Sequence, residues 1–364
     1  MASPEMASVR ELQFDRRNPR LVEMDVSDST PDDTIVQMLW DAMDVEEVVL
    51  SIAASGFFPH EPLIVAREEG QQVVIEGNRR LAALRVLLGT ELASELNVRV
   101  PVLSNEARKD LEEVPVIYGT REGVWRYLGF KHVNGPAKWT SYAKACFVAQ
   151  VHREYNVSLN AIAYQIGDTH KTIQRLFRGL MVIEQAEKFK VFDRDNRYKN
   201  HFSFSHLYTG LDYSGISNFI GLSSADEETQ EPVPSERKGE LGELMLWLYG
   251  NRREHIQPVV QSQNPNLREL DTVVAHVEAL ATLRAGRSLA YALEVSQPPD
   301  NVFRDSLLRA KEELQRARAM LTTGYSGSAD LARIAHEVAN LADDLCVEMA
   351  RKRPGRRRHR TGDL

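Results

Sequence analysis

The chain has 364 residues, 43% of them hydrophobic and 27% charged, with a formal net charge of −7. This composition indicates a globular protein with buried cores in two or three domains. It holds no run of eighteen or more apolar residues and no signal-like leader, so we expect a cytoplasmic protein without a membrane partner. Cys146 and Cys346 lack CxxC partners and a nearby histidine cluster, which predicts buried free thiols; we identify no metal site.

Between residues 73 and 88 a short β-rich run leads into an amphipathic helix through the sequence Glu-Gly-Asn-Arg-Arg. Gly77 permits a tight turn there, and the free amides of a helix start favour an anion. Arg79 and Arg80 oppose the helix dipole at this position, so something anionic is expected to compensate them. Either a bound phosphate or a carboxylate of the same domain fits, and these residues alone leave both alternatives open.

Three further segments extend this motif into a family resemblance. Residues 51–56, the strand-like residues 61–65 and the Asn-Pro-Arg sequence at 18–20, taken with the Gly-x-Arg-Arg turn, resemble the N-terminal domain of ParB-like proteins. The resemblance implies an α+β domain at 1–125 with the fold shared by sulfiredoxin and a site for CTP or another nucleoside triphosphate with Mg²⁺. The expected nucleotide-binding residues are Gly56, Gly77, Asn78, Arg79, Arg80, His132 and Asn134.

The chain departs from this family at two places. Partition proteins usually carry a glutamate associated with nucleotide hydrolysis where this chain has Asn78, and they carry a Glu-Asn-x-Gln-Arg motif where it has residues 128–136. Because Mg²⁺ prefers oxygen ligands, losing both carboxylates favours binding over catalysis. We identify no catalytic residue. A weak NTPase or a nuclease on the same fold stays an alternative, as does a DNA-bound scaffold without nucleotide.

The middle of the chain is basic, with 14 Lys or Arg against 7 Asp or Glu between residues 120 and 200. A helix is expected from 138 to 155, with Trp139 and Tyr142 in the core. Ser158 then predicts the cap of a helix through 165, Gly167 a turn, and Thr169 the cap of a second helix. The buried contacts of a helix-turn-helix are expected from Ile162, Ile166, Ile173 and Leu176.

The exposed face of that second helix is expected to read double-stranded DNA within a domain at 126–222. Its side chains are of the types that contact base edges and phosphates in a major groove. Any two packed helices separated by glycine imitate this pattern, and the position after a ParB-like domain supports the DNA-binding interpretation. The expected DNA-binding residues are Thr169, His170, Lys171, Thr172, Gln174, Arg175 and Arg178.

The last third is expected to be helical. Residues 223–240 are acidic and rich in turn formers, which predicts a solvated linker. Helices are expected at 242–249, 267–285, 301–321 and 328–351 in an assembly domain at 241–350, and residues 351–364 predict a basic disordered tail. The last two helices are amphipathic and either complete a bundle or pair two copies.

Together these features predict an α+β N-terminal domain followed by all-α helix-turn-helix and helical C-terminal domains. The function they favour is that of a homodimeric, ParB-like DNA-binding protein whose nucleotide pocket acts as a conformational switch. Plasmid partition, a mobile element or phage defence would supply its context, with operon partners that the sequence does not identify.

Overall fold

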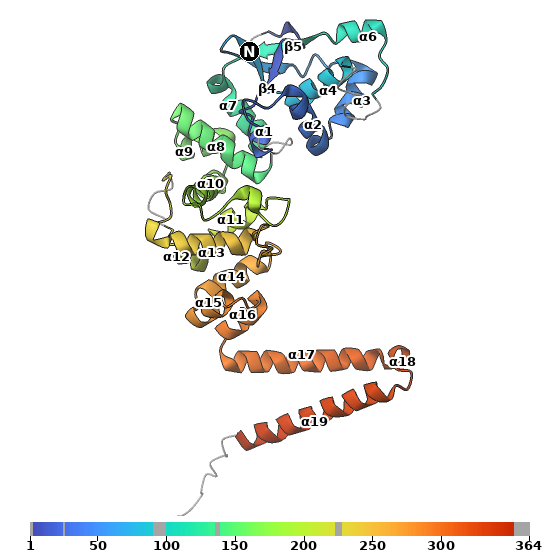
Figure 1. The fold of residues 1–364 in the computed structure, drawn as a ribbon, viewed down its shortest axis with the longest axis vertical. Helices are drawn as coiled ribbons and strands as arrows, with labels where there is room; N and C mark the ends of the chain where they lie inside the picture. The colour runs from blue at the N-terminus through green and yellow to red at the C-terminus, as the bar shows by residue number, and fades with distance from the viewer. Residues whose placement is uncertain (1–2, 25, 90–99, 135–138, 223–227, 353–364) are drawn as a thin grey trace, which may run out of the picture. The chain divides into compact units, whose positions relative to one another are not determined.

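The computed structural model describes residues 3–24, 26–89, 100–134, 139–222 and 228–352. The chain divides into two compact units, Met1–Ser296 and Gln297–Leu364. The first unit combines a β-sheet with helices and the second contains helices, so the fold is of the mixed α+β kind (Figure 1). None of the described helices combines the length and the apolar character needed to cross a membrane.

A five-stranded sheet forms the N-terminal part of the first unit, in the order β1-β5-β3-β4-β2. Antiparallel pairing joins β1 to β5 and β3 to β4, whereas β2 with β4 and β3 with β5 run parallel. The β3–β4 turn contains Glu69 and Gly70, both with positive φ, as expected for a tight hairpin turn. The strands are β1 (Glu5–Ser8), β2 (Leu12–Phe14), β3 (Leu63–Glu68), β4 (Gln71–Glu76) and β5 (Glu113–Tyr118).

Helices pack on this sheet around a core of aliphatic side chains. The expected helix at 78–88 is present as α4, but it is buried on more than one face, because the four consecutive residues Leu81 to Leu84 are all completely buried. The helices of this part are α1 (Pro19–Glu23), α2 (Asp32–Met43), α3 (Val45–Ser55), α4 (Asn78–Leu88) and α6 (Asn105–Asp110).

The helical part of the first unit has one continuous core that extends from Trp125 to Ala292. It begins with α7 (Arg121–Gly129), which runs directly into a π-helical segment, η1 (Phe130–Asn134), before α8 (Ser141–Tyr155). The elements that follow are α9 (Leu159–Ile166), α10 (Thr172–Lys188), η2 (Arg194–Asn196), α11 (Phe204–Gly210), α12 (Ser214–Phe219), η3 (Ser235–Arg237), α13 (Lys238–Tyr249), α14 (Asn266–Val274), α15 (Val277–Arg284) and α16 (Leu289–Ser296).

The helix-turn-helix geometry expected at residues 158–178 is present. The Ser158 hydroxyl accepts from the N–H of Ala161, and Gly167 has the left-handed conformation that ends α9. All four expected core residues of the motif are buried. The prediction that Thr169 caps the second helix is wrong: α10 begins at Thr172, and the Asp168 carboxylate accepts the N–H of Ile173 in its first turn and that of His170 just before it.

Part of the segment expected to be a solvated linker at 223–240 packs against this core instead. Residues 223–227 lie outside the described residues, but Val233 is buried and exchanges two hydrogen bonds with the Gln185 side chain. The Glu228 carboxylate accepts the N–H of Leu159 at the start of α9. The acidic residues here therefore serve as caps and ion-pair partners, which composition alone does not reveal. The part of the expected assembly domain before Gln297 belongs to the first unit.

Two further expectations about the helices need correction. The helix expected at 267–285 is broken between α14 and α15, where His276 is extended and its Nδ1 lies 2.9 Å from the carbonyl oxygen of Thr272. The prediction that both cysteine thiols are buried is also wrong, because Cys146 is half-buried and Cys346 is exposed.

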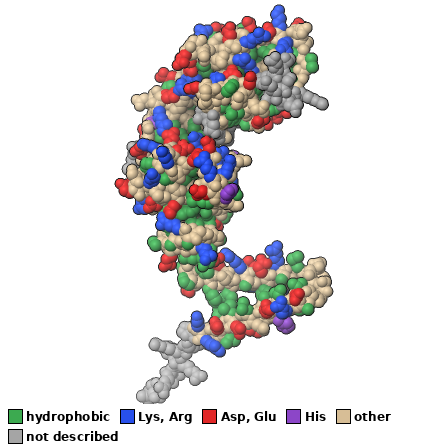
Figure 2. Space-filling model, viewed as in Figure 1, with side chains coloured by type: hydrophobic (Ala, Val, Ile, Leu, Met, Phe, Trp, Pro, Cys, Tyr) green, Lys and Arg blue, Asp and Glu red, His purple; other side chains and the backbone are tan. Residues whose placement is uncertain are grey.

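The second unit consists of α17 (Pro299–Ala319), α18 (Leu321–Gly324) and α19 (Ala329–Lys352). Neither long helix contains a buried residue, and large hydrophobic side chains such as Leu308 and Leu341 are at least half exposed. Figure 2 shows hydrophobic side chains along this hairpin. Both helices are close to their expected bounds, and most of the expected basic tail, residues 353–364, lies outside the described residues.

Candidate functional site

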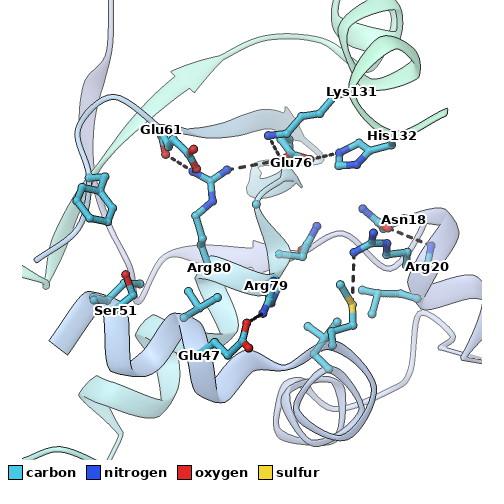
Figure 3. A pocket seen from close by; sticks show the side chains of 18 of the residues that line it. Asn18, Arg20, Glu47, Ser51, Glu61, Glu76, Arg79, Arg80, Lys131 and His132 are labelled. Carbon is cyan, nitrogen blue, oxygen red and sulfur yellow. Dashed lines mark hydrogen bonds and ion pairs between the residues drawn. The ribbon is translucent and has the colours of Figure 1, made fainter. Parts of the chain in front are cut away.

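A cavity of about 890 Å³ opens between the sheet part and the segment that follows α7. Its walls come from α1, α2, α3, the loop before β3, the β4–α4 junction, η1 and Trp139 (Figure 3). A volume of this size is typical of a small-molecule site. Seven of the residues that line it are charged: Arg20, Glu47, Glu61, Glu76, Arg79, Arg80 and Lys131.

Gly77 makes the turn that brings α4 to the cavity. Its φ of 105° is one that residues with a side chain rarely adopt, and a Cβ there would lie 2.4 Å from Cδ2 of the buried Leu63. The N–H groups in the first turn of a helix have no intrahelical partners, and in α4 no side chain caps them. The junction therefore presents main-chain donors and the positive end of a helix dipole to the cavity.

Asn78 lines the cavity, but its side chain is engaged by the main chain. Its Nδ2 donates to the carbonyl of Val74 at 2.8 Å, and its Oδ1 accepts the N–H of Asp15 at 3.1 Å. The residue is 7% exposed. It therefore fastens the start of α4 to the loop after β2, and its main chain is the group that remains for a ligand.

Arg79 and Arg80 already have anionic partners within the first unit. Arg79 lies 3.4 Å from the Glu47 carboxylate and also donates to the carbonyl of Asp44. Arg80 donates to the carbonyl of Glu61 and lies 3.5 Å from the Glu76 carboxylate. The alternative of internal carboxylate pairing is thus present in the structure, although Glu47 and Glu61 are 80% and 70% exposed at their side chains.

Glu76 is the buried carboxylate of the cavity, and two consecutive residues of η1 bind it. Lys131 Nζ lies 2.7 Å from one carboxylate oxygen and His132 Nε2 lies 2.7 Å from the other (Figure 3). Burial opposes ionisation of Glu76, but the hydrogen bonds and charges of His132 and Lys131 outweigh burial and lower its pKa to about 2. Glu76 is therefore ionised at neutral pH and joins β4 to η1.

The π-helical geometry of η1 places both side chains on that carboxylate. Single π-turns are rare and occur often at functional sites. The segment is held further by the N–H of Trp139, which donates to the carbonyl of His132, and the two rings stack 4.5 Å apart. Trp139 is buried, so its assignment to the core is confirmed, and it also forms one wall of the cavity. The sequence analysis did not identify Lys131 as a site residue.

The start of α7 is fixed to the sheet part by a second ionic cluster. Both Arg121 guanidinium ends contact the buried Asp15 carboxylate, at 2.7 and 2.9 Å, and its Nε donates to Glu68. Burial raises the pKa of Asp15, although the Arg121 contacts act in the opposite direction. This cluster anchors the start of α7, and η1 follows directly at its end.

The remaining expected nucleotide-binding residues are placed less favourably. Gly56 ends α3 with a positive φ but is not among the residues that line the cavity. Asn134 is the last residue of η1, and its side chain lies outside what the structure describes. Asn18 and Arg20, from the Asn-Pro-Arg segment, do line the cavity, and Arg20 approaches the sulfur of Met43 (Figure 3).

Within the described ranges no three His, Cys, Asp or Glu side chains gather as a set of metal ligands. The oxygens of Glu76 are taken by Lys131 and His132, so this carboxylate is not available to a hard cation. The residues present therefore fit an anionic ligand better than a metal ion bound directly by the protein.

The expected DNA-reading face on α10 is only partly open. Thr169, His170 and Lys171 are exposed, whereas Thr172, Gln174, Arg175 and Arg178 are half-buried. Gln174 donates to the side chain of Asn160 at 2.9 Å. Arg175 and Arg178 both pair with Asp212, at 2.5 and 2.6 Å, because the loop after α11 reaches this face. Arg175 and Arg178 are therefore half-buried and ion-paired, so the expected exposed face is only partly present.

No family model and no curated protein matches the chain. Among solved structures, the C-terminally truncated chromosome-partitioning protein ParB from Caulobacter crescentus complexed with CTP-γ-S is 14% identical, over 66% of this chain and 99% of that one, with a TM-score of 0.21. The same protein complexed to the centromeric parS site is 15% identical, over 62% and 96%, with a TM-score of 0.31. At these values the similarity is too weak to decide a fold or a function for this chain.

Proposed function

We propose that the cavity of the first unit binds the phosphates of a nucleoside triphosphate, CTP or another, and that the helix-turn-helix binds double-stranded DNA. The observation that carries the nucleotide proposal is the start of α4, where a glycine turn, free main-chain donors and two arginines meet at one cavity. A phosphate accepts from all of these groups at once.

The charges of the cavity favour an exchange of partners when phosphate binds. Glu47 and Glu61 are largely exposed, and ion pairs of that kind contribute about 0–1 kcal/mol. A hydrogen bond from an arginine to an ionised group contributes roughly 1.5–3 kcal/mol. The two carboxylates can swing into solvent, so the phosphate replaces a weak partner of each arginine with a stronger one.

Binding without rapid turnover follows from the carboxylates. Asn78 has no charge with which to orient water or hold a metal, and Glu76 is engaged by Lys131 and His132. Any Mg²⁺ would be held by phosphate oxygens and water. We therefore infer a binding protein whose NTPase activity is slow or absent.

The ligand would act as a switch through η1. Lys131 lies at the cavity wall and belongs to η1, which joins α7 to α8 within the core that contains the helix-turn-helix. A phosphate that takes Arg80 or Lys131 from Glu76 changes the contact between β4 and η1. Differential contacts of this kind are what a ligand needs to shift a conformational equilibrium.

A DNA-bound scaffold without nucleotide is the second candidate. One observation favours it: Arg79 and Arg80 are already compensated by carboxylates and carbonyls of the same unit. No described contact favours the nuclease alternative in the same way. Calorimetry with CTP, ATP and GTP, each with and without Mg²⁺ and DNA, separates the switch from the scaffold, because the scaffold gives no heat with any nucleotide.

We also propose that two copies associate through the second unit. The apolar side chains of α17 and α19 are exposed, at a cost of roughly 25 cal/mol for each Å² of apolar surface left in water. A second copy would cover them with matching stripes. A cytoplasmic homodimer serving partition, a mobile element or phage defence is the context that we propose for this assembly.

A further inference from the structure

Two loops of the first unit, residues 190–203 and 250–257, are fastened together by asparagine side chains. Asn196 Nδ2 donates to Asn251 Oδ1 at 2.9 Å, and Asn196 Oδ1 accepts the N–H of Arg253 at 2.9 Å. The N–H of Arg252 donates to the carbonyl of Asn196 at 2.7 Å. Because both polar atoms of the Asn196 side chain are hydrogen-bonded to the second loop, the two loops are fixed relative to each other. We call the surface that they form the loop platform.

The loop platform carries more positive than negative charge. Its two segments contain six Lys or Arg and three acidic residues, Asp193, Asp195 and Glu254. Lys190, Lys199, Arg252 and Arg253 are exposed, as are His201 and His255. Next to the platform the pKa of His206 is lowered, mainly by burial and to a lesser degree by the charges of Lys199 and His201.

Most of these cations are not neutralised. Within the described part of the chain, Lys190, Arg197, Lys199 and Arg252 form no ion pair, whereas Arg253 pairs with Asp193 at 3.6 Å and Arg194 pairs with Glu187 at 2.6 Å. Neutral oxygens orient three of them instead. Lys199 donates to the carbonyl of Gln261, Arg252 to the Asn200 side chain, and Arg197 to the carbonyls of Arg194 and Asn200.

The expected recognition helix shows the opposite arrangement. Its two arginines share the single carboxylate of Asp212, so about half of their charge is compensated before any DNA arrives. The loop platform follows the C-terminal end of the same helix, α10, in the same compact unit. Figure 2 shows Lys and Arg side chains among acidic ones on the visible face of the helical part.

We propose that the loop platform is a second DNA-contacting surface, which binds the phosphate backbone of double-stranded DNA without reading its sequence. This inference rests on the proposed DNA-binding function. Phosphate contacts fix the register and orientation of a DNA-binding protein on the duplex, and base contacts supply the sequence preference. Rigid, exposed and unpaired cations suit the first task, and the shorter side chains at the start of α10 suit the second.

The test is a salt titration of DNA binding by the full chain carrying Lys199→Gln and Arg252→Gln together. Each phosphate contact contributes about 0.9 to the slope of log affinity against log salt. Losing two contacts therefore makes this negative slope shallower by about 1.8. The ratio of wild-type to variant affinity should then fall by about twelvefold between 50 and 200 mM salt. At low salt the double variant should lose the same factor of affinity for DNAs of different sequence.

Two matched variants separate charge from structure. Arg10→Gln with Lys109→Gln removes two exposed cations from the sheet part and should leave the slope unchanged. Lys199→Arg with Arg252→Lys keeps the charge and should retain the wild-type slope. The variants should share one thermal unfolding midpoint, since the altered side chains are exposed.

The outcomes separate this inference from the function on which it rests. A wild-type protein that binds no DNA at 50 mM salt overturns both. A wild-type protein that binds while the Lys199 and Arg252 double variant keeps its slope overturns the second surface alone. If the Lys199 and Arg252 double variant loses affinity for single-stranded RNA and keeps its affinity for double-stranded DNA, the choice of partner is wrong.

Discussion

Replacing Glu76 with glutamine should cost the first unit several kcal/mol of folding free energy. The side chain keeps its shape, but Lys131 and His132 lose the carboxylate that both of them contact at 2.7 Å. Lowering the pKa of Glu76 from its ordinary value of 4.5 to about 2 corresponds to about 3 kcal/mol of stability. Because the folded pKa is the lower one, this contribution is complete above pH 4.5 and disappears as the pH falls toward 2.

Urea unfolding followed by circular dichroism measures this contribution. We expect the wild type to exceed Glu76→Gln by about 3 kcal/mol at pH 7, with the difference narrowing below pH 4.5. Glu47→Gln is the matched control, since that carboxylate is 80% exposed and should change stability by less than about 1 kcal/mol. A difference at pH 7 no larger than that of the control, or one that does not change with pH, would refute the role assigned to Glu76.

Three further variants test other parts of the structure. Gly77→Ala should lower stability by about 1–3 kcal/mol in the same unfolding assay, because the positive φ and the close Leu63 side chain both oppose a Cβ. Asp212→Asn should tighten DNA binding and steepen its salt dependence in a shift assay, because it releases the two arginines of α10; weaker binding would contradict their assignment. The double variant Ile334→Glu, Leu341→Glu should be a monomer in light scattering where the wild type is a dimer. A wild type that is itself monomeric at high concentration would rule out the proposed interface.

Features that depend on neighbours in sequence were predictable. The helix-turn-helix followed from a serine cap, a left-handed glycine and isoleucines at helical spacing, all within about twenty residues. The turn at Gly77 was predictable for the same reason. A glycine between a strand and a helix adopts the left-handed conformation that such a turn needs, and this depends only on neighbouring residues. The amphipathic pattern of α19 gave its bounds to within a residue.

Partners distant in sequence were not predictable. Glu76 and His132 are 56 residues apart, and nothing in the sequence around His132 predicts the π-turn that brings them together. Asp212 follows α11 and contacts Arg178 only after the helices have packed, so the helix pattern alone does not predict this ion pair. Composition was misleading for the acidic segment near Val233, since the few apolar residues in it decide where the segment packs.

The most direct test of the nucleotide proposal is calorimetric titration of the wild-type protein and Arg79→Ala with CTP, ATP and GTP. We expect the wild type to bind at least one triphosphate with a Kd below about 1 mM, and Arg79→Ala to bind at least tenfold more weakly, a loss of about 1.4 kcal/mol, with its fold intact. Arg10→Ala, outside the cavity, should bind as the wild type does. If the wild type binds no triphosphate at about 1 mM, the switch is wrong, and Arg79 and Arg80 are internal ion-pair partners or DNA-phosphate contacts.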